Sequence, residues 1–132
     1  MKTVRSCISL AALALVGLVS AAQAAEPLTK QQVIDLISGA KVTQRGEDPS
    51  EHAGRMVEYQ AGGRATGSDL GRRKGFVEAG TWEVNAKGQL CVQWQGETSA
   101  KCAYLVPTGR NTYNMTKDPS KRGKTDIVGI SK

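Results

Sequence analysis

The chain has 132 residues, and 18 Lys and Arg against 12 Asp and Glu give it a formal net charge of +6. A chain of this length holds one small domain with one modest core, which excludes a second domain. Positive residues alternate with Glu and Asp through most of the sequence. Nucleic-acid-binding proteins concentrate positive charge on one face, so we expect a solvated surface here and no nucleic-acid partner.

The first 24 residues have the pattern of a secretory signal peptide. Two cations lie near the start, Ile8 to Val19 are almost all apolar, and Ala22-Gln23-Ala24 is a small-x-small cleavage site. The apolar run is too short to span a bilayer, and no stop-transfer segment follows it. We therefore expect cleavage after Ala24, a mature domain of residues 25–132 with no transmembrane segment, and a periplasmic or secreted location.

A short amphipathic helix is predicted over Lys30–Ser38. Thr29 can cap its start, and Gln32 three residues later completes a capping box. One face of the helix carries Val33, Ile34 and Ile37. Gly39 suits the left-handed closing position. The helix therefore needs an apolar surface to lie on.

The rest of the chain has the pattern of an antiparallel β-meander. Strands are expected at 55–60, 80–84, 89–94, 101–106, 112–116 and 125–130, a turn at Gly62-Gly63 leads into a short segment at 64–66, and the pattern for a strand at 41–44 is weak. A glycine-punctuated connection is expected at 67–75 and a turn at 107–111. The strongest signal is the hairpin around Asn85-Ala86-Lys87-Gly88, whose composition is typical of a type I turn closed by a left-handed glycine. The fold class is therefore mainly β, with about six strands forming a curved sheet or small barrel beside one N-terminal helix.

Two cysteines, Cys91 and Cys102, remain once the predicted signal peptide and its Cys7 are removed. Two thiols close in sequence and in an oxidising compartment predict one structural disulfide. A two-residue turn at Gly96-Glu97 places these cysteines opposite each other on neighbouring strands. That count puts the pair at a hydrogen-bonded position, where the side chains converge less, so a longer loop or a bulge is the alternative.

The six aromatic residues are expected to supply the main apolar mass of a small core. If the curved sheet instead leaves a concave face open, some of them would face a ligand. The candidate ligand-facing residues are Trp82, Trp94, Tyr104 and Tyr113.

Residues suited to catalysis or metal binding are few. His52 is the only histidine and lies in a polar loop, and its acidic neighbours Glu47, Asp48 and Glu51 lack the spacing of a calcium loop. We therefore expect no metal and no cofactor. Glu78 and Glu83 are a possible carboxylate pair, although alternation places Glu83 opposite Trp82 and in solvent.

Two basic clusters stand out from the otherwise mixed charge. The cationic candidates for anion binding are Arg72, Arg73 and Lys74 in one cluster and Lys121, Arg122 and Lys124 in the other. Either cluster can attract phosphate, lipid headgroups or acidic glycans by charge alone, although most basic loops are simply solvated.

The hairpin region resembles a known family. Gly80-Thr81-Trp82-Glu83-Val84, then Gly88 to Trp94, then Lys101-Cys102-Ala103-Tyr104 resemble the signature of the domain of unknown function 995 family, small secreted proteins of Gram-negative bacteria. The resemblance implies a secreted location, a disulfide and a β-rich fold. It assigns no catalytic residue.

The leading hypothesis is a non-enzymatic binding module that engages a small apolar ligand, a cell-envelope component or another protein. One alternative is a hydrolase or transferase that uses Glu83, Glu78 or Asp69. The other is an anion-binding envelope protein that uses the two basic clusters.

Overall fold

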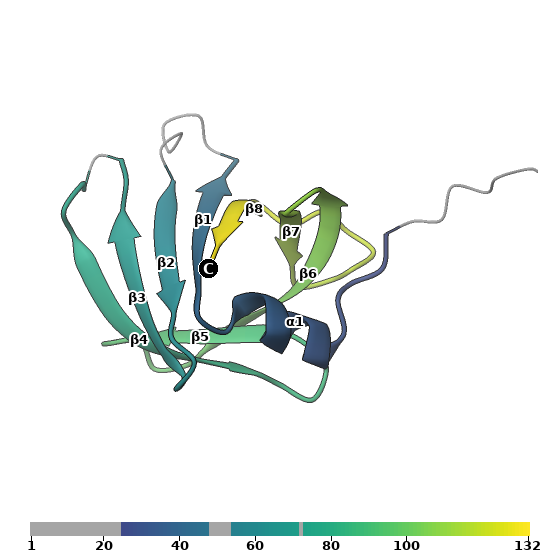
Figure 1. Ribbon diagram of the computed structural model, residues 1–132, viewed down its shortest axis with the longest axis horizontal. Coiled ribbons are helices and arrows are strands. Elements are labelled where there is room, and N and C mark those ends of the chain that lie inside the picture. The colour runs from purple at the N-terminus through teal and green to yellow at the C-terminus, as the bar shows by residue number, and fades with distance from the viewer. Residues whose placement is uncertain (1–24, 48–53, 72) are drawn as a thin grey trace, which may run out of the picture.

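The computed structural model describes residues 25–47, 54–71 and 73–132 (Figure 1). The expected signal peptide, His52 and Arg72 lie outside these residues. The elements in chain order are α1 (Lys30–Ile37), β1 (Ala40–Gly46), β2 (Arg55–Tyr59), β3 (Arg64–Asp69), β4 (Val77–Val84), β5 (Leu90–Trp94), β6 (Lys101–Gly109), β7 (Thr112–Thr116) and β8 (Thr125–Ser131).

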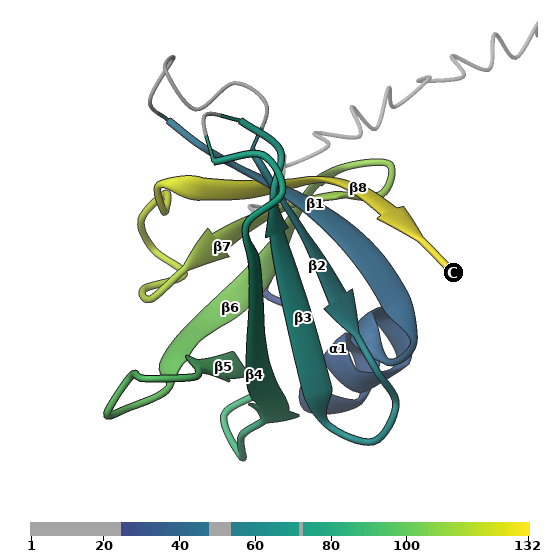
Figure 2. The same cartoon turned by 90° about the vertical axis from the view of Figure 1, so that its left-hand side faces the viewer.

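The strands form a closed antiparallel barrel in chain order, with β1 paired to β8 (Figures 1 and 2). The expected fold class is confirmed, and the barrel alternative is the one the chain adopts. The described residues contain eight strands rather than about six. The difference is partly due to β1, whose local signal is weak but which is held between β2 and β8 by ladders on both sides.

The helix α1 begins and ends much as predicted. Thr29 and Gln32 form the capping box, and Gly39 has a φ of +75° just beyond the C-cap Ser38. The Gly39 amide donates to the Tyr59 carbonyl at 2.7 Å, and the Leu28 amide donates to the Leu105 carbonyl at 2.8 Å. These bonds hold α1 against one end of the barrel.

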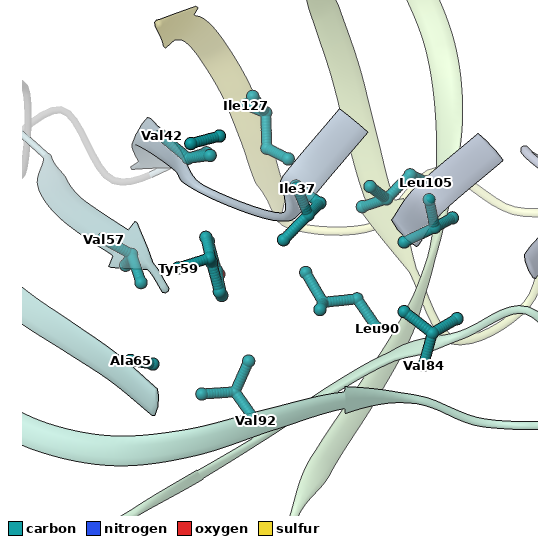
Figure 3. Close-up of a cluster of buried hydrophobic side chains, with 12 residues drawn as sticks. Ile37, Val42, Val57, Tyr59, Ala65, Val84, Leu90, Val92, Leu105 and Ile127 are labelled. Carbon is teal, nitrogen blue, oxygen red and sulfur yellow. The ribbon is translucent and has the colours of Figure 1, made fainter. Parts of the chain in front are cut away.

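The core fills the barrel beneath this helix (Figure 3). It contains Val33 and Ile37 from α1 and inward-facing residues of the strands: Ala40, Val42, Val57, Tyr59, Ala65, Val84, Leu90, Val92, Leu105 and Ile127. Strand alternation sends these side chains inward and their neighbours outward. The helix face therefore finds the apolar surface that the sequence requires.

The connections of a meander barrel alternate between its two ends. The end that carries α1 also carries the β2–β3, β4–β5 and β6–β7 turns. The connections β1–β2, β3–β4, β5–β6 and β7–β8 lie at the opposite end, which we call the open end. Figure 2 shows α1 and the β3–β4 connection at opposite ends of the barrel.

Three expected connections differ from the observed ones. The 67–75 connection is shorter, because Gly67 and Ser68 pair with Glu78 and Val77 and so extend β3 and β4. The turn at 107–111 is confined to Arg110 and Asn111, because Pro107 lies at an irregularity in the β6–β7 ladder, where a missing amide is tolerated.

The third difference is the β5–β6 connection, which is a loop over 95–100 and not a two-residue turn. Cys91 still pairs with Cys102, their Cα atoms lie 4.0 Å apart, and the two are joined in a disulfide. The predicted disulfide is therefore present, and the longer-loop alternative describes its surroundings.

Candidate functional site

The outer face of the β4–β5 hairpin carries two adjoining shallow grooves. The larger, about 390 Å³, is lined by Ala79, Gly80, Thr81, Gln93, Trp94, Gln95, Gly96 and Glu97. The smaller, about 120 Å³, is lined by Thr81, Trp82, Glu83, Cys91, Gln93 and Ala100. Thr81 and Gln93 belong to both grooves. We therefore treat them as one feature, the outer trough.

The wall of the outer trough is the β5–β6 loop, which is tied to the hairpin beside it. The Gln93 side-chain amide donates to the Glu97 carbonyl at 3.0 Å, and the Glu97 amide donates to the Trp94 carbonyl at 3.0 Å. The Gln95 amide extends the hairpin ladder by donating to the Ala79 carbonyl at 2.8 Å. With the disulfide at the other end of the loop, these bonds fix the shape of the trough before any ligand arrives.

The outer trough combines a mainly apolar larger groove with polar and acidic side chains. Thr81, Gln93 and Gln95 offer neutral hydroxyl and amide groups, whereas Glu83 and Glu97 offer carboxylates. Nζ of Lys101 lies 3.1 Å from Oε1 of Glu97. The other carboxylate oxygen of Glu97, Oε2, is buried and has no hydrogen-bond partner among the described residues. Unsatisfied buried acceptors are rare, so this wall favours a ligand or water that brings hydrogen-bond donors and disfavours an anion.

Behind the floor of the trough, the interior of the open end holds an ion pair. Nη2 of Arg55 lies 2.6 Å from Oε2 of Glu78, and the Arg55 guanidinium stacks 4.1 Å from the ring centroid of Trp94. A Cβ on Gly67 would lie 2.1 Å from Nη2 of Arg55, and a Cβ on Gly80 would lie 2.8 Å from the Trp94 ring. The two glycines therefore make the room in which this layer packs.

Tyr59 joins the apolar core to this polar layer. Its ring is buried in the core, and its hydroxyl accepts a 3.0 Å hydrogen bond from the side-chain amide of Gln44. Burial raises the pKa of Tyr59 to about 12, against smaller opposing effects of Gln44 and Arg55. The phenol therefore stays protonated over the whole neutral range.

The four candidate ligand-facing aromatics do not share one surface. Trp82 is half-buried, donates its indole N–H to the Gln60 carbonyl at 2.8 Å, and meets Tyr59 edge to face at 5.9 Å. Trp94 and Tyr113 also pack against the core from inside the barrel. Tyr104 alternates with the buried Leu105 and so lies on the outer face of β6. Trp82 and Trp94 both border the outer trough.

The carboxylates proposed for catalysis are not brought together. Glu78 faces inward to Arg55, whereas Glu83 is exposed on the opposite face of β4, as alternation predicts. Asp69 accepts a 2.7 Å hydrogen bond from the Gly71 amide and so fixes the start of a loop. Within the described ranges, no three His, Cys, Asp or Glu side chains gather in a way that could hold a metal ion.

The described cations of the two basic clusters lie in connections at the open end. Arg73 stacks over Phe76 at 3.9 Å, and Lys74 follows it in the β3–β4 connection. In the β7–β8 connection, Nη2 of Arg122 lies 2.7 Å from Oδ2 of Asp126, and Lys121 and Lys124 are exposed.

Sequence reasoning missed the two features that depend on long-range register. Arg55 and Glu78 lie far apart along the chain, and only the β2–β3–β4 register brings them together. The trough wall arises from the fold of the 95–100 loop over the hairpin. The one sequence signal for this ion pair is a charged residue at an inward position of each strand, Arg55 in β2 and Glu78 in β4.

Two further observations bear on what the chain is. In the part of the chain that the structure describes, no helix has the length and apolar character needed to cross a membrane. No family model, no curated protein and no solved structure matches the chain.

Proposed function

We propose that the protein is a non-enzymatic binding module whose ligand lies in the outer trough. The observation that carries this proposal is the pre-formed wall of the trough, which the disulfide and the Gln93–Glu97 hydrogen bond hold in place. Sites whose side chains are already fixed bind with a smaller loss of entropy than sites that must order on binding.

The interior of the barrel is a less suitable site in its helix-closed half. Core side chains with almost no exposure occupy that half, and α1 covers its end. An outer-face ligand needs no displacement of this core. An enzymatic role has less support than binding, because Glu78 and Glu83 point to opposite faces of β4.

The chemistry of the trough suits a neutral ligand that has both hydrogen-bonding groups and apolar surface. Thr81, Gln93 and Gln95 can each donate and accept hydrogen bonds, and the carboxylates of Glu83 and Glu97 accept them. The span from Ala79 to Glu83 is about 14 Å at the usual rise of a strand, which suits a short oligosaccharide. A glycan of the cell envelope offers both hydroxyl groups and apolar ring faces, so it can match both the polar side chains and the apolar surface of the trough.

A substitution that fills the trough tests this proposal. Thr81→Arg places a long side chain where the two grooves join, and Val128→Arg places the same side chain on the exposed outer face of β8 as a matched control. The probe is chito-oligosaccharide, a neutral glycan with hydroxyl and acetamido groups. Backbone amide NMR shifts on titration provide the measurement.

We expect saturable shifts at β4, β5 and the 95–100 loop in the parent and in Val128→Arg, and their loss in Thr81→Arg. Thermal melts of both variants show whether the fold is retained. Equal titration of all three proteins, or shifts confined to another face, would contradict the proposed site.

A further inference from the structure

The β3–β4 and β7–β8 connections lie at the same end of the barrel and on opposite sides of it. Four strands separate them in either direction around the closed ring of eight. Each carries exposed cations: Arg73 and Lys74 in the first, Lys121 and Lys124 in the second. We call these four residues the basic rim.

The β7–β8 connection is held in a defined shape by two buried polar side chains of β7. The Asn114 amide donates to the Gly123 carbonyl at 3.0 Å, and its oxygen accepts from the Gly123 amide at 2.8 Å. The Thr116 hydroxyl lies 2.8 Å from the carbonyl oxygens of both Asp118 and Lys121. Lys121 and Lys124 are therefore presented from an ordered loop.

Three carboxylates near the basic rim make contacts within the protein, and Glu47 is exposed just after β1 at the same end. Asp126 pairs with Arg122, and Asp69 bonds to the Gly71 amide. Asp118 accepts hydrogen bonds from the hydroxyl and the amide of Ser120, which lower its pKa. Of the ion pairs formed among the described residues, none includes a cation of the basic rim. Asp118 attracts Lys121 without forming a direct ion pair with it, and the exposed rim cations can still engage an external anion.

An exposed aromatic residue lies at the same end. Phe76 is 45 % exposed, and the guanidinium of Arg73 stacks 3.9 Å from its ring centroid. An exposed aromatic ring beside a cation is typical of surfaces that lie in the headgroup region of a bilayer.

We propose that the basic rim docks the protein onto a membrane surface that contains anionic phospholipid. The cations lie on opposite sides of a barrel end, so they do not converge on one phosphate, whereas a planar array of headgroups can engage both sides together. Each Lys or Arg near an anionic surface strengthens binding about fivefold. The basic rim and the outer trough consist of different residues, so this inference does not depend on the trough binding a glycan.

Vesicle sedimentation tests the proposal with the purified chain. Vesicles of phosphatidylcholine with and without phosphatidylglycerol are the probes. The rim variant carries Arg73→Gln, Lys74→Gln, Lys121→Gln and Lys124→Gln. The matched control removes the same charge from exposed cations at the helix-covered end: Lys30→Gln, Arg64→Gln, Lys87→Gln and Arg110→Gln.

We expect the parent to bind only the vesicles with phosphatidylglycerol, and the rim variant to bind them weaker by about two to three orders of magnitude. The control variant should retain most of the affinity. Equal losses in the two variants would show that net charge alone drives binding and would overturn the proposal, as would an absence of vesicle binding by the parent.

A second variant separates a membrane from a soluble polyanion. Phe76→Ser should weaken vesicle binding several-fold and leave binding to dextran sulfate unchanged, because only a bilayer interface accepts the ring. If Phe76→Ser has no effect on vesicles and dextran sulfate competes fully with them, the rim recognises a polyanionic chain and the membrane assignment is wrong.

Discussion

The two halves of the barrel interior are built from the same strands but have opposite chemistry. Near α1, inward positions carry apolar side chains such as Val42, Leu90 and Leu105. Toward the open end, the same strands turn Gln44, Arg55 and Glu78 inward. Alternation along a strand determines which side chains point into the barrel, but it does not determine whether that part of the interior is apolar or polar.

The difference shows where stability and adaptability lie. Apolar side chains with almost no exposure fill the helix-closed half, and their burial is the main favourable contribution to folding. The open half contributes a partly exposed ion pair and the room left by Gly67 and Gly80. We therefore expect mutations in the first half to reduce stability strongly and mutations in the second to do so weakly.

The largest effect is expected from Leu105→Ala in the helix-closed half. Leu105 has no exposed surface, and its truncation leaves a cavity beneath α1. The free energy of unfolding should fall by about 3–5 kcal/mol in a denaturant titration. Val77→Ala, at a side chain that is 61 % exposed, is the control and should change it by less than about 0.5 kcal/mol. If both variants lowered the free energy of unfolding by similar amounts, the proposed difference between the two halves would be wrong.

Next in size is the loss of the disulfide. Replacing Cys91 and Cys102 with Ser removes a link that closes a short loop, which should cost about 3 kcal/mol on the chain-entropy model. Hydrogen exchange should accelerate most in the 95–100 loop, because the β5–β6 ladder pairs only three residues on each strand. Unchanged exchange in that loop would show that hydrogen bonds alone hold the trough wall.

Tyr59 lies where the two halves meet, and its raised pKa predicts that the free energy of unfolding falls at alkaline pH. A pKa raised from 10 to about 12 means that the folded state keeps a proton that the unfolded state releases. Its contribution is complete below pH 10 and is lost as the pH rises to about 12, by about 2–3 kcal/mol in all. Denaturant titrations across that range measure the slope, and Tyr59→Phe should lack it. The same slope in both proteins would assign the effect to other groups.

The smallest effect is expected from Glu78→Gln in the open half. The variant removes the charge partner of Arg55, but both side chains are about one-third exposed or less, so solvent screens part of the loss. The free energy of unfolding should fall by about 1 kcal/mol. Arg122→Gln, which breaks a more exposed pair with Asp126, should cost less. If Glu78→Gln lowered the free energy of unfolding as much as Leu105→Ala, the ion pair of the open half would be as well shielded from water as the core.

The features that the sequence predicted well are encoded locally. The capping box of Thr29 and Gln32 and the left-handed Gly39 lie within a few residues of the helix they bound. The β4–β5 turn likewise needs only Asn85 to Gly88, and Gly88 has the expected positive φ of +84°. Hydrophobic alternation in β4 and β5 then gives the faces of the hairpin, and the paired cysteines fix its partner β6.

The features that could not be predicted depend on contacts between distant segments. Glycine is a poor strand residue, so the sequence predicts a connection from Gly67 onward. In the structure Gly67 lies in β3, where the Arg55 side chain leaves no room for a Cβ. The trough wall depends on the path of a six-residue loop that carries no strong turn signal. Successive connections alternate between the two ends of the barrel. The sequence therefore shows which cations share the open end only once the number of strands is known.

The ladder between β1 and β8 differs from the other ladders of the barrel because it joins strands from opposite ends of the chain. The other ladders are hairpins, which close at little entropic cost as soon as their strands exist. Assembly therefore has one late step, in which β8 docks against β1 and completes the ring. A chain that stops before Thr125 keeps its hairpins but leaves β1 and β7 as free edges. Because free edges pair with other chains, its expected fate is strand exchange and self-association rather than simple unfolding.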